Sequence, residues 1–187
     1  AYTPPSLALS LATVSVSFDG GGLSLPGRIH FVSPGQINVQ IPWEFQGQSS
    51  VQMKVTFLGY MSSYVYTVPL ATYSPGVFGV VDFQTGAIGS TKAGNTIEIF
   101  MNGLGPVTTT PASGEPTPAQ PLPSTGVTPS VTIGGTPAQV IFSGLAPGFV
   151  GLYQVNATLP ANTPSGTQPL VVSIGGVAAQ TINLTVQ

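Results

Sequence analysis

Residues 131–160 read VTIGGTPAQVIFSGLAPGFVGLYQVNATLP, and this stretch determines the fold that we expect for the whole chain. Val131 and Ile133 alternate with polar neighbours and are followed by Gly134-Gly135, a pair typical of hairpin turns. The loop Leu145–Gly148 then separates two further predicted strands. The apolar positions of those two strands are Val140, Phe142, Val155, Ala157 and Leu159.

The same pattern occurs earlier in the chain. Residues 14–42 read VSVSFDGGGLSLPGRIHFVSPGQINVQIP, in which Phe31 corresponds to Phe142. The segment QINVQIP at 36–42 corresponds to QVNATLP at 154–160, and the second copy carries a longer loop before it. An internal repeat of this length predicts two similar β-units rather than one large domain.

Composition favours strands throughout the chain. Charged residues make up 4% of the 187 positions, whereas about 25% is usual. The 24 Gly and 19 Pro residues favour turns, and no helical period is sustained over about a dozen residues. The sequence therefore predicts an all-β protein with two tandem Ig-like β-sandwich domains at residues 1–72 and 73–187, with an N-terminal extension at 1–13.

Several functional classes are disfavoured by charge and composition. The net charge is −2 and the only basic residues are Arg28, Lys54 and Lys92, so we expect no nucleic-acid partner. No apolar run reaches the roughly 18 residues of a membrane span, so we expect no membrane insertion. The chain has no cysteine, which excludes a disulfide scaffold.

The start of the sequence and its polar composition suggest export. The chain begins Ala-Tyr-Thr-Pro, which fits a mature product after removal of a signal peptide, although a trimmed chain would begin in the same way. A surface rich in Ser, Thr, Gln, Asn and Gly is typical of extracellular β-proteins. Because it carries little charge, such a surface also offers little repulsion against self-association. We therefore predict a secreted, extracellular or cell-surface location.

Long motifs resemble a known family. VSPGQINVQIP (32–42), YSPGVF (73–78), NGLGPVT (102–108) and the 131–156 region resemble the C-terminal module of secreted acidobacterial paralogs of the Solibacter type, which has two Ig-like repeats. The resemblance implies an exported bacterial cell-surface sandwich and no enzymatic activity. Unit two contains the strand AGNTIEI at 93–99, but unit one has no counterpart before Val14. Unit one therefore looks one strand short.

Residues with catalytic or metal-binding chemistry are sparse. His30 is the only histidine and lies between Ile29 and Phe31 in a predicted strand, which indicates an outward-facing strand residue. The five carboxylates are scattered, with no cluster that would hold calcium or zinc. No helix is predicted after the Gly pairs, so they are turn formers rather than phosphate cradles. We expect no catalytic residue, no metal and no cofactor, and hence no enzyme.

Two sets of residues are candidates for contact with glycans. Trp43, Tyr60, Tyr64 and Tyr66 could form a sugar-stacking platform, although aromatic residues of a sandwich more often pack in a core. The Pro/Thr-rich segment 108–129 predicts an exposed loop, which is either O-glycosylated or an unmodified flexible loop. The candidate glycosylation sites are Thr108, Thr109, Thr110 and Thr117 in this loop, together with the sequon residues Asn156 and Asn183.

The N-terminal segment provides the most specific hypothesis. Apolar residues stand at odd positions (Leu7, Leu9, Leu11) and then at even positions from Val14, with the change at Ala12-Thr13. This change indicates a bulge, a crossing between sheets, or two strands with different partners. A strand-deficient sandwich invites strand donation, and burial of three leucines would contribute roughly 5–9 kcal/mol before ordering losses. The alternative is that residues 6–18 complete their own domain.

These observations lead to one predicted function and two alternatives. We predict an extracellular structural protein that self-assembles into a filament, with Leu7, Leu9 and Leu11 as the donated strand and other copies of the chain as partners. The first alternative is a carbohydrate-binding or adhesive cell-surface module that uses the aromatic residues. The second is a fragment of a hydrolase whose catalytic part lies elsewhere.

Overall fold

The all-β prediction is confirmed by a computed structural model of the chain, which describes residues 6–187. Ala1–Pro5, the beginning of the predicted N-terminal extension, lie outside the described residues. The single helical element in the described part is a 3-10 turn, η1 (Trp43–Phe45). No helix within residues 6–187 is long and apolar enough to cross a membrane.

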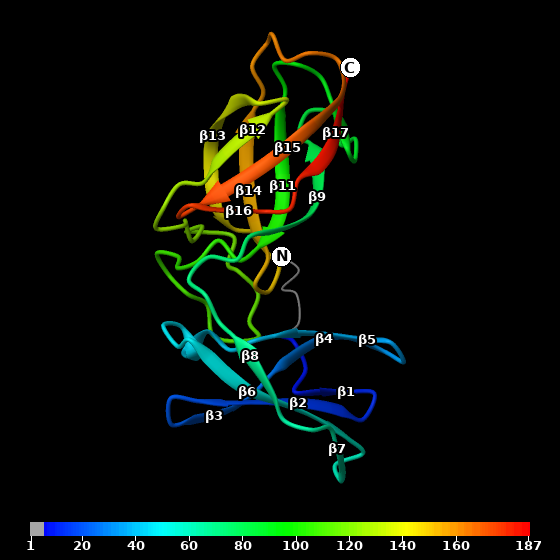
Figure 1. The fold of residues 1–187 in the computed structure, drawn as a ribbon, viewed down its shortest axis with the longest axis vertical. Helices are drawn as coiled ribbons and strands as arrows, with labels where there is room; N and C mark the ends of the chain where they lie inside the picture. Colours follow the sequence, from blue (N-terminus) through cyan, green and yellow to red (C-terminus); the bar gives the residue numbers. More distant parts are fainter. Residues whose placement is uncertain (1–5) are drawn as a thin grey trace. The chain divides into compact units, whose positions relative to one another are not determined.

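The chain forms two compact units (Figure 1). Unit 1 contains residues up to Thr72, together with Thr110–Pro118 and Gly148–Gly151. Unit 2 contains Tyr73–Thr109, Ala119–Pro147 and Leu152–Gln187. Two short segments from the middle of the sequence thus belong to unit 1, although they are far from its other residues along the chain.

Unit 1 contains a six-stranded sheet and a separate two-stranded sheet. In the larger sheet, β1, β2, β6 and β7 are neighbours in that order, β3 also pairs with β2, and β8 also pairs with β6. The smaller sheet is the β4–β5 hairpin. The strands are β1 (Ser10–Leu11), β2 (Val14–Gly20), β3 (Leu23–Pro26), β4 (Arg28–Ser33), β5 (Gln36–Gln40), β6 (Ser50–Phe57), β7 (Met61–Ser62) and β8 (Tyr66–Pro69).

The core of unit 1 lies between these two sheets. Alternation in β2 places Val14, Val16 and Phe18 on the inner face, where all three are buried. Ile29 of β4, Phe45 of η1 and Val51 of β6 complete the buried cluster. Partly buried side chains of the hairpin, Val32, Ile37 and Val39, pack against it.

Unit 2 contains a nine-stranded sheet that curves until it is nearly a barrel (Figure 1). The strand order is β10-β17-β15-β12-β13-β14-β11-β9, and β16 pairs with β15. The strands are β9 (Gly76–Asp82), β10 (Ser90–Thr91), β11 (Thr96–Asn102), β12 (Ser130–Ile133), β13 (Thr136–Leu145), β14 (Tyr153–Thr158), β15 (Gly166–Ile174), β16 (Val177–Ala178) and β17 (Ile182–Val186).

The core of unit 2 is built from the alternating apolar residues of its long strands. Ile97, Ile99 and Met101 of β11 are fully buried, as are Val155 and Ala157 of β14. Strands β12, β15 and β17 contribute Ile133, Leu170, Val172 and Leu184, which are also fully buried. The alternation read from the sequence therefore matches the inward-facing positions of this unit.

The repeat seen in the sequence produces the same hairpin in each unit. Phe31 of β4 pairs with Asn38 of β5, and Phe142 of β13 pairs with Asn156 of β14. In both hairpins the register shifts just before the phenylalanine, so that His30 and Ile141 are bulge residues at equivalent positions. The two units can therefore be compared residue by residue along this hairpin.

The prediction that the whole 108–129 segment is an exposed loop is wrong for part of its length. Ser113 and Thr117 are only 8% and 3% exposed. The Ser113 hydroxyl accepts a hydrogen bond from the Trp43 amide at 2.9 Å and donates one to Glu44 at 2.6 Å. Proline prevents ladder pairing but not burial, and residues 110–118 are fixed within unit 1 by bonds to loop groups.

Candidate functional site

The N-terminal segment of the described chain crosses between the two sheets of unit 1. Ala8 forms an isolated bridge with Ile29 on the edge of β4, and its carbonyl accepts a hydrogen bond from the Ile29 amide at 2.8 Å. The Leu7 amide donates to the Gly114 carbonyl, also at 2.8 Å. After a bend at Leu9 the chain joins the other sheet as β1. The chain therefore changes sheet at Leu9, before the shift of apolar positions at Ala12-Thr13, and residues 7–18 pair within their own unit.

The change from odd to even apolar positions results from a tight hairpin. Leu11 pairs directly with Val14, so only Ala12 and Thr13 form the turn. Both have positive φ, 47° and 66°, as a two-residue type I′ turn requires. This conformation favours Asn and Gly, and it is unfavourable for Ala and still more for a β-branched residue. The turn is therefore strained, by about 1–2 kcal/mol per residue.

The leucines of this segment are poorly buried in their own unit. Leu7 is partly buried, while Leu9 and Leu11 are 48% and 39% exposed. The backbone of the segment hydrogen-bonds to Ile29 and Gly114 and pairs with β2. The three leucines at alternate positions thus contribute only part of the hydrophobic stabilisation that full burial would give.

Part of the inner face of the six-stranded sheet has no covering layer. Leu11 pairs with Val14, Val14 with Phe57, and Phe57 with Met61. Residues that pair directly across strands share a face, and Val14 marks this face as the core side. Leu11, Phe57 and Met61 nevertheless remain 39%, 42% and 48% exposed. The separate sheet of this unit contains only two strands, β4 and β5, against six in the larger sheet.

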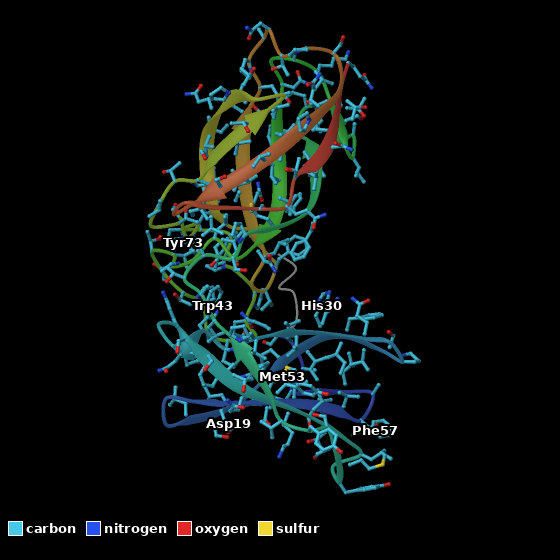
Figure 2. The ribbon with its side chains drawn as sticks, viewed as in Figure 1. Asp19, His30, Trp43, Met53, Phe57 and Tyr73 are labelled. Carbon is cyan, nitrogen blue, oxygen red and sulfur yellow. The ribbon has the colours of Figure 1, made fainter. Side chains whose placement is uncertain are left out.

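An open apolar cavity lies under the hairpin. Its volume is about 300 Å³, and its apolar lining comes from Ile37 and Val39 of β5, Val16 of β2, and Met53 and Val55 of β6. The turn residues Ser33–Gln36 form its rim. Figure 2 shows Met53 between the two layers of the unit. A cavity of about 150 Å³ can hold a benzene ring, so this space can hold branched aliphatic side chains.

The free edge of β5 borders this cavity. Within residues 6–187, β5 pairs with β4 and with no other strand. Its counterpart in unit 2, β14, pairs with β13 on one edge and with β11 on the other. The free edge of β5 is therefore the edge that would pair with a counterpart of β11. This is the strand, at residues 93–99 of unit 2, for which the sequence of unit 1 has no equivalent.

The residues considered for catalysis remain apart from one another. His30 is exposed on the outer side of the β4 bulge (Figure 2). Glu44 and Glu115 accept hydrogen bonds from Ser113 and Ser6, and Glu98 accepts one from Gln154. In the described range 6–187, no three His, Cys, Asp or Glu residues are grouped as a metal site would require.

Asp82 of β9 is a buried carboxylate that sequence reasoning did not single out. Burial alone would raise its pKa, but hydrogen bonds from Thr91, Asn95 and Thr85 outweigh this effect and lower the pKa below its usual range. The Asn95 amide and the Thr85 backbone amide lie 2.8 and 2.7 Å from its oxygens. The carboxylate therefore fixes the corner of unit 2 between β9, β10 and β11.

The proposed aromatic platform is not assembled. Trp43 is half-buried in η1, before β6 begins, whereas Tyr60 follows the other end of β6. At about 3.3 Å per residue, β6 is roughly 23 Å long, and Figure 2 shows Trp43 and Phe57 at its opposite ends. Tyr60, Tyr64 and Tyr66 are 76%, 87% and 56% exposed. The tyrosines are thus available at the surface, but separately from Trp43.

The candidate glycosylation residues differ in accessibility. Thr108, Thr109, Thr110 and Asn183 are exposed. Thr117 is buried and its hydroxyl donates to the Phe149 carbonyl at 2.9 Å, so that in the folded unit it is not accessible to a glycosyl donor. Asn156 is partly buried in β14 and its side-chain oxygen accepts a hydrogen bond from Gln154.

No protein-family model matches the chain, and no curated protein is significantly similar to it in sequence. The relationship to the Solibacter-type paralogs therefore stays a prediction from the quoted motifs.

The strained turn leads to a stability prediction. We expect the double substitution Ala12→Asn and Thr13→Gly to raise the free energy of unfolding of unit 1 by about 1–2 kcal/mol, because Asn-Gly is suited to a type I′ turn. Denaturant titration with a probe in unit 1 measures this change. Unchanged or reduced stability would contradict the description of the turn as strained.

Asp82 leads to a second prediction. We expect Asp82→Asn to destabilise unit 2 by roughly 1.5–3 kcal/mol, because the amide would point donors at groups that now donate to the carboxylate. Because the folded-state pKa is lowered, the stabilisation is present above the unfolded-state pKa of about 3.9 and is lost as the pH falls below it. Thermal unfolding measured between neutral and acidic pH tests both the loss of stability and its dependence on pH. The matched control is Asp19→Asn, because Asp19 is exposed.

Proposed function

We propose that this protein is a structural subunit of an extracellular homopolymer, in which the N-terminal segment of one copy is donated as a β-strand to the next. The observation that carries this proposal is a combination within unit 1. A leucine-bearing terminal segment is half exposed, while the inner face of its own sheet is partly uncovered. Each feature is unfavourable in an isolated molecule, and strand donation removes both.

The energetic case depends on burial. Leu9 and Leu11 are about half exposed in their own unit, and complete burial of a leucine contributes about 1.5–3 kcal/mol relative to exposure. Opening of the Ala12-Thr13 turn also releases the backbone strain described above. Because each subunit carries one donor and one acceptor, head-to-tail donation can add subunits indefinitely, and it produces a filament where the rotation between subunits does not close a ring.

Composition supports assembly outside the cell. With 4% charged residues, neighbouring subunits repel one another weakly. Exposed threonines at 108–110 offer attachment points for glycans, which would supply hydration to a surface with few charges. We extend the proposal to two Ig-like sandwiches on a bacterial cell surface, for which the quoted sequence motifs and the all-β fold are the support.

The proposal predicts that assembly depends on the exposed leucines of the segment. We expect Leu9→Ser together with Leu11→Ser to abolish polymers seen by negative-stain microscopy and light scattering, with each unit still folded. The matched control is Leu23→Ser, since Leu23 of β3 is 40% exposed and outside the donated segment. A wild-type chain that remains a discrete monomer at high concentration would refute the proposal.

Glycan binding remains a second candidate because three tyrosines of unit 1 are highly exposed, Tyr64 at 87%. Exposed aromatic rings stack well on the apolar faces of sugars. We expect Tyr64→Ala to weaken polysaccharide binding, while Trp43→Ala leaves it unchanged, because Trp43 lies at the other end of β6. Isothermal titration with soluble polysaccharides measures both effects, and equal losses would contradict this assignment.

A further inference from the structure

Unit 2 shows what a completed version of the unit 1 hairpin looks like. In unit 2, the edge strand of the equivalent hairpin, β14, is flanked by β11. Strand β11 runs antiparallel to β14 and places Ile97, Ile99 and Met101 in the core, where all three are fully buried. In unit 1, the corresponding side of β5 borders the open cavity instead.

The hairpin that both units share defines the register that a strand added to β5 would have. Asn38 is equivalent to Asn156, because each pairs with the phenylalanine that follows the bulge. Val39 and Ile37 are then equivalent to Ala157 and Val155, which pair with Ile97 and Ile99. A strand added to β5 in the manner of β11 would therefore place apolar residues opposite Val39, Ile37 and Gly35, and all three line the cavity.

The donated segment has the spacing of β11. Leu7, Leu9 and Leu11 alternate with Ala8 and Ser10, as Ile97, Ile99 and Met101 alternate with Glu98 and Phe100. If the segment runs antiparallel to β5, Leu7 lies opposite Val39, Leu9 opposite Ile37 and Leu11 opposite Gly35. The glycine leaves room at the rim for the last leucine, and the smaller neighbours face outward.

The geometry points to the free edge of β5 in one copy as the acceptor for residues 7–11 of another copy, with the Ala12-Thr13 turn as the hinge that opens. This inference rests on the proposed function and names its interaction surface. Donation adds a ladder along β5, an edge that has no partner strand within residues 6–187, and places leucine side chains in the cavity, with Leu11 beside the turn at Gly35. The partner is a second copy of this chain.

A second possible acceptor lies at the edges of β4 and β2 of another copy. This position becomes vacant when that copy donates its own segment. Exchange into that position would repeat the present contacts, with Leu9 and Leu11 about half exposed, and would leave the cavity open. The β5 edge offers more apolar contact, because Ile37, Val39 and Val16 line it from two layers. The two acceptors predict different neighbours for Ser10.

The absence of cysteine from the chain allows a direct test by disulfide trapping. On the β5 edge, Ser10 lies opposite Gln36, as Phe100 lies opposite Gln154 in unit 2. In the closed hairpin, Ser10 instead pairs with Ser15 of its own chain. Ser10, Ser15 and Gln36 are at least partly exposed, so cysteine at these positions does not disturb a core.

The first variant is Ser10→Cys with Gln36→Cys. Oxidation of assembled material should give a ladder of covalent multimers on a gel run without reductant, whereas the single variant Ser10→Cys should give dimers at most. The second variant is Ser10→Cys with Ser15→Cys. Its oxidation before assembly should close the hairpin within one chain and prevent polymer formation by the oxidised molecules, and reductant should restore assembly.

The outcomes separate the inference from the proposed function. If polymers form and only the 10/15 pair gives a ladder, the acceptor is the vacated position, which overturns the inference and leaves strand donation intact. If polymers form and neither pair gives a ladder, the β5 acceptor is wrong. If neither the wild-type chain nor any reduced variant forms polymers, the proposed function itself fails.

Discussion

A β-sheet with one apolar face must have that face covered and its edges protected, and unit 1 meets this requirement only in part. Its six-stranded sheet is faced by a hairpin of two strands, and on the inner side Leu11, Phe57 and Met61 are left partly exposed to water. The exposed leucines, the open cavity and the free β5 edge all result from this shortage of strands. Unit 2 does not share it, because β11 occupies the equivalent edge.

The contrast between the two units also suggests where stability is concentrated. In unit 2 the strands interlock through a continuous ladder, and a buried carboxylate is satisfied by neighbouring hydroxyl and amide groups. In unit 1 the N-terminal segment is attached through strand edges and a turn with two residues in the left-handed region. Segments of low local stability are the ones that can rearrange on binding. We therefore expect the N-terminal segment of unit 1 to rearrange more readily than the strands of unit 2.

Much of the fold could be predicted from the sequence, because alternation and glycine turns are local signals. The repeat at 36–42 and 154–160 correctly placed equivalent hairpins. The shift of apolar positions at Ala12-Thr13 marks a turn within one sheet, whereas the chain changes sheet earlier, between Ala8 and Ser10. The hairpin itself was missed, since Ala-Thr lacks the Asn or Gly that normally marks such a turn. The burial of Ser113 and Thr117 and the separation of Trp43 from the tyrosines could not be predicted, because both depend on tertiary contacts between distant segments.

The return of residues 110–118 to unit 1 has a consequence for biosynthesis. Ser113 accepts a hydrogen bond from the Trp43 amide, and the Gly114 carbonyl accepts one from the Leu7 amide. Residues 110–118 are synthesised after residues 6–72, so Leu7 and Trp43 emerge from the ribosome before their hydrogen-bond partners Gly114 and Ser113. Unit 1 can therefore complete these contacts only after the chain has been synthesised beyond residue 118.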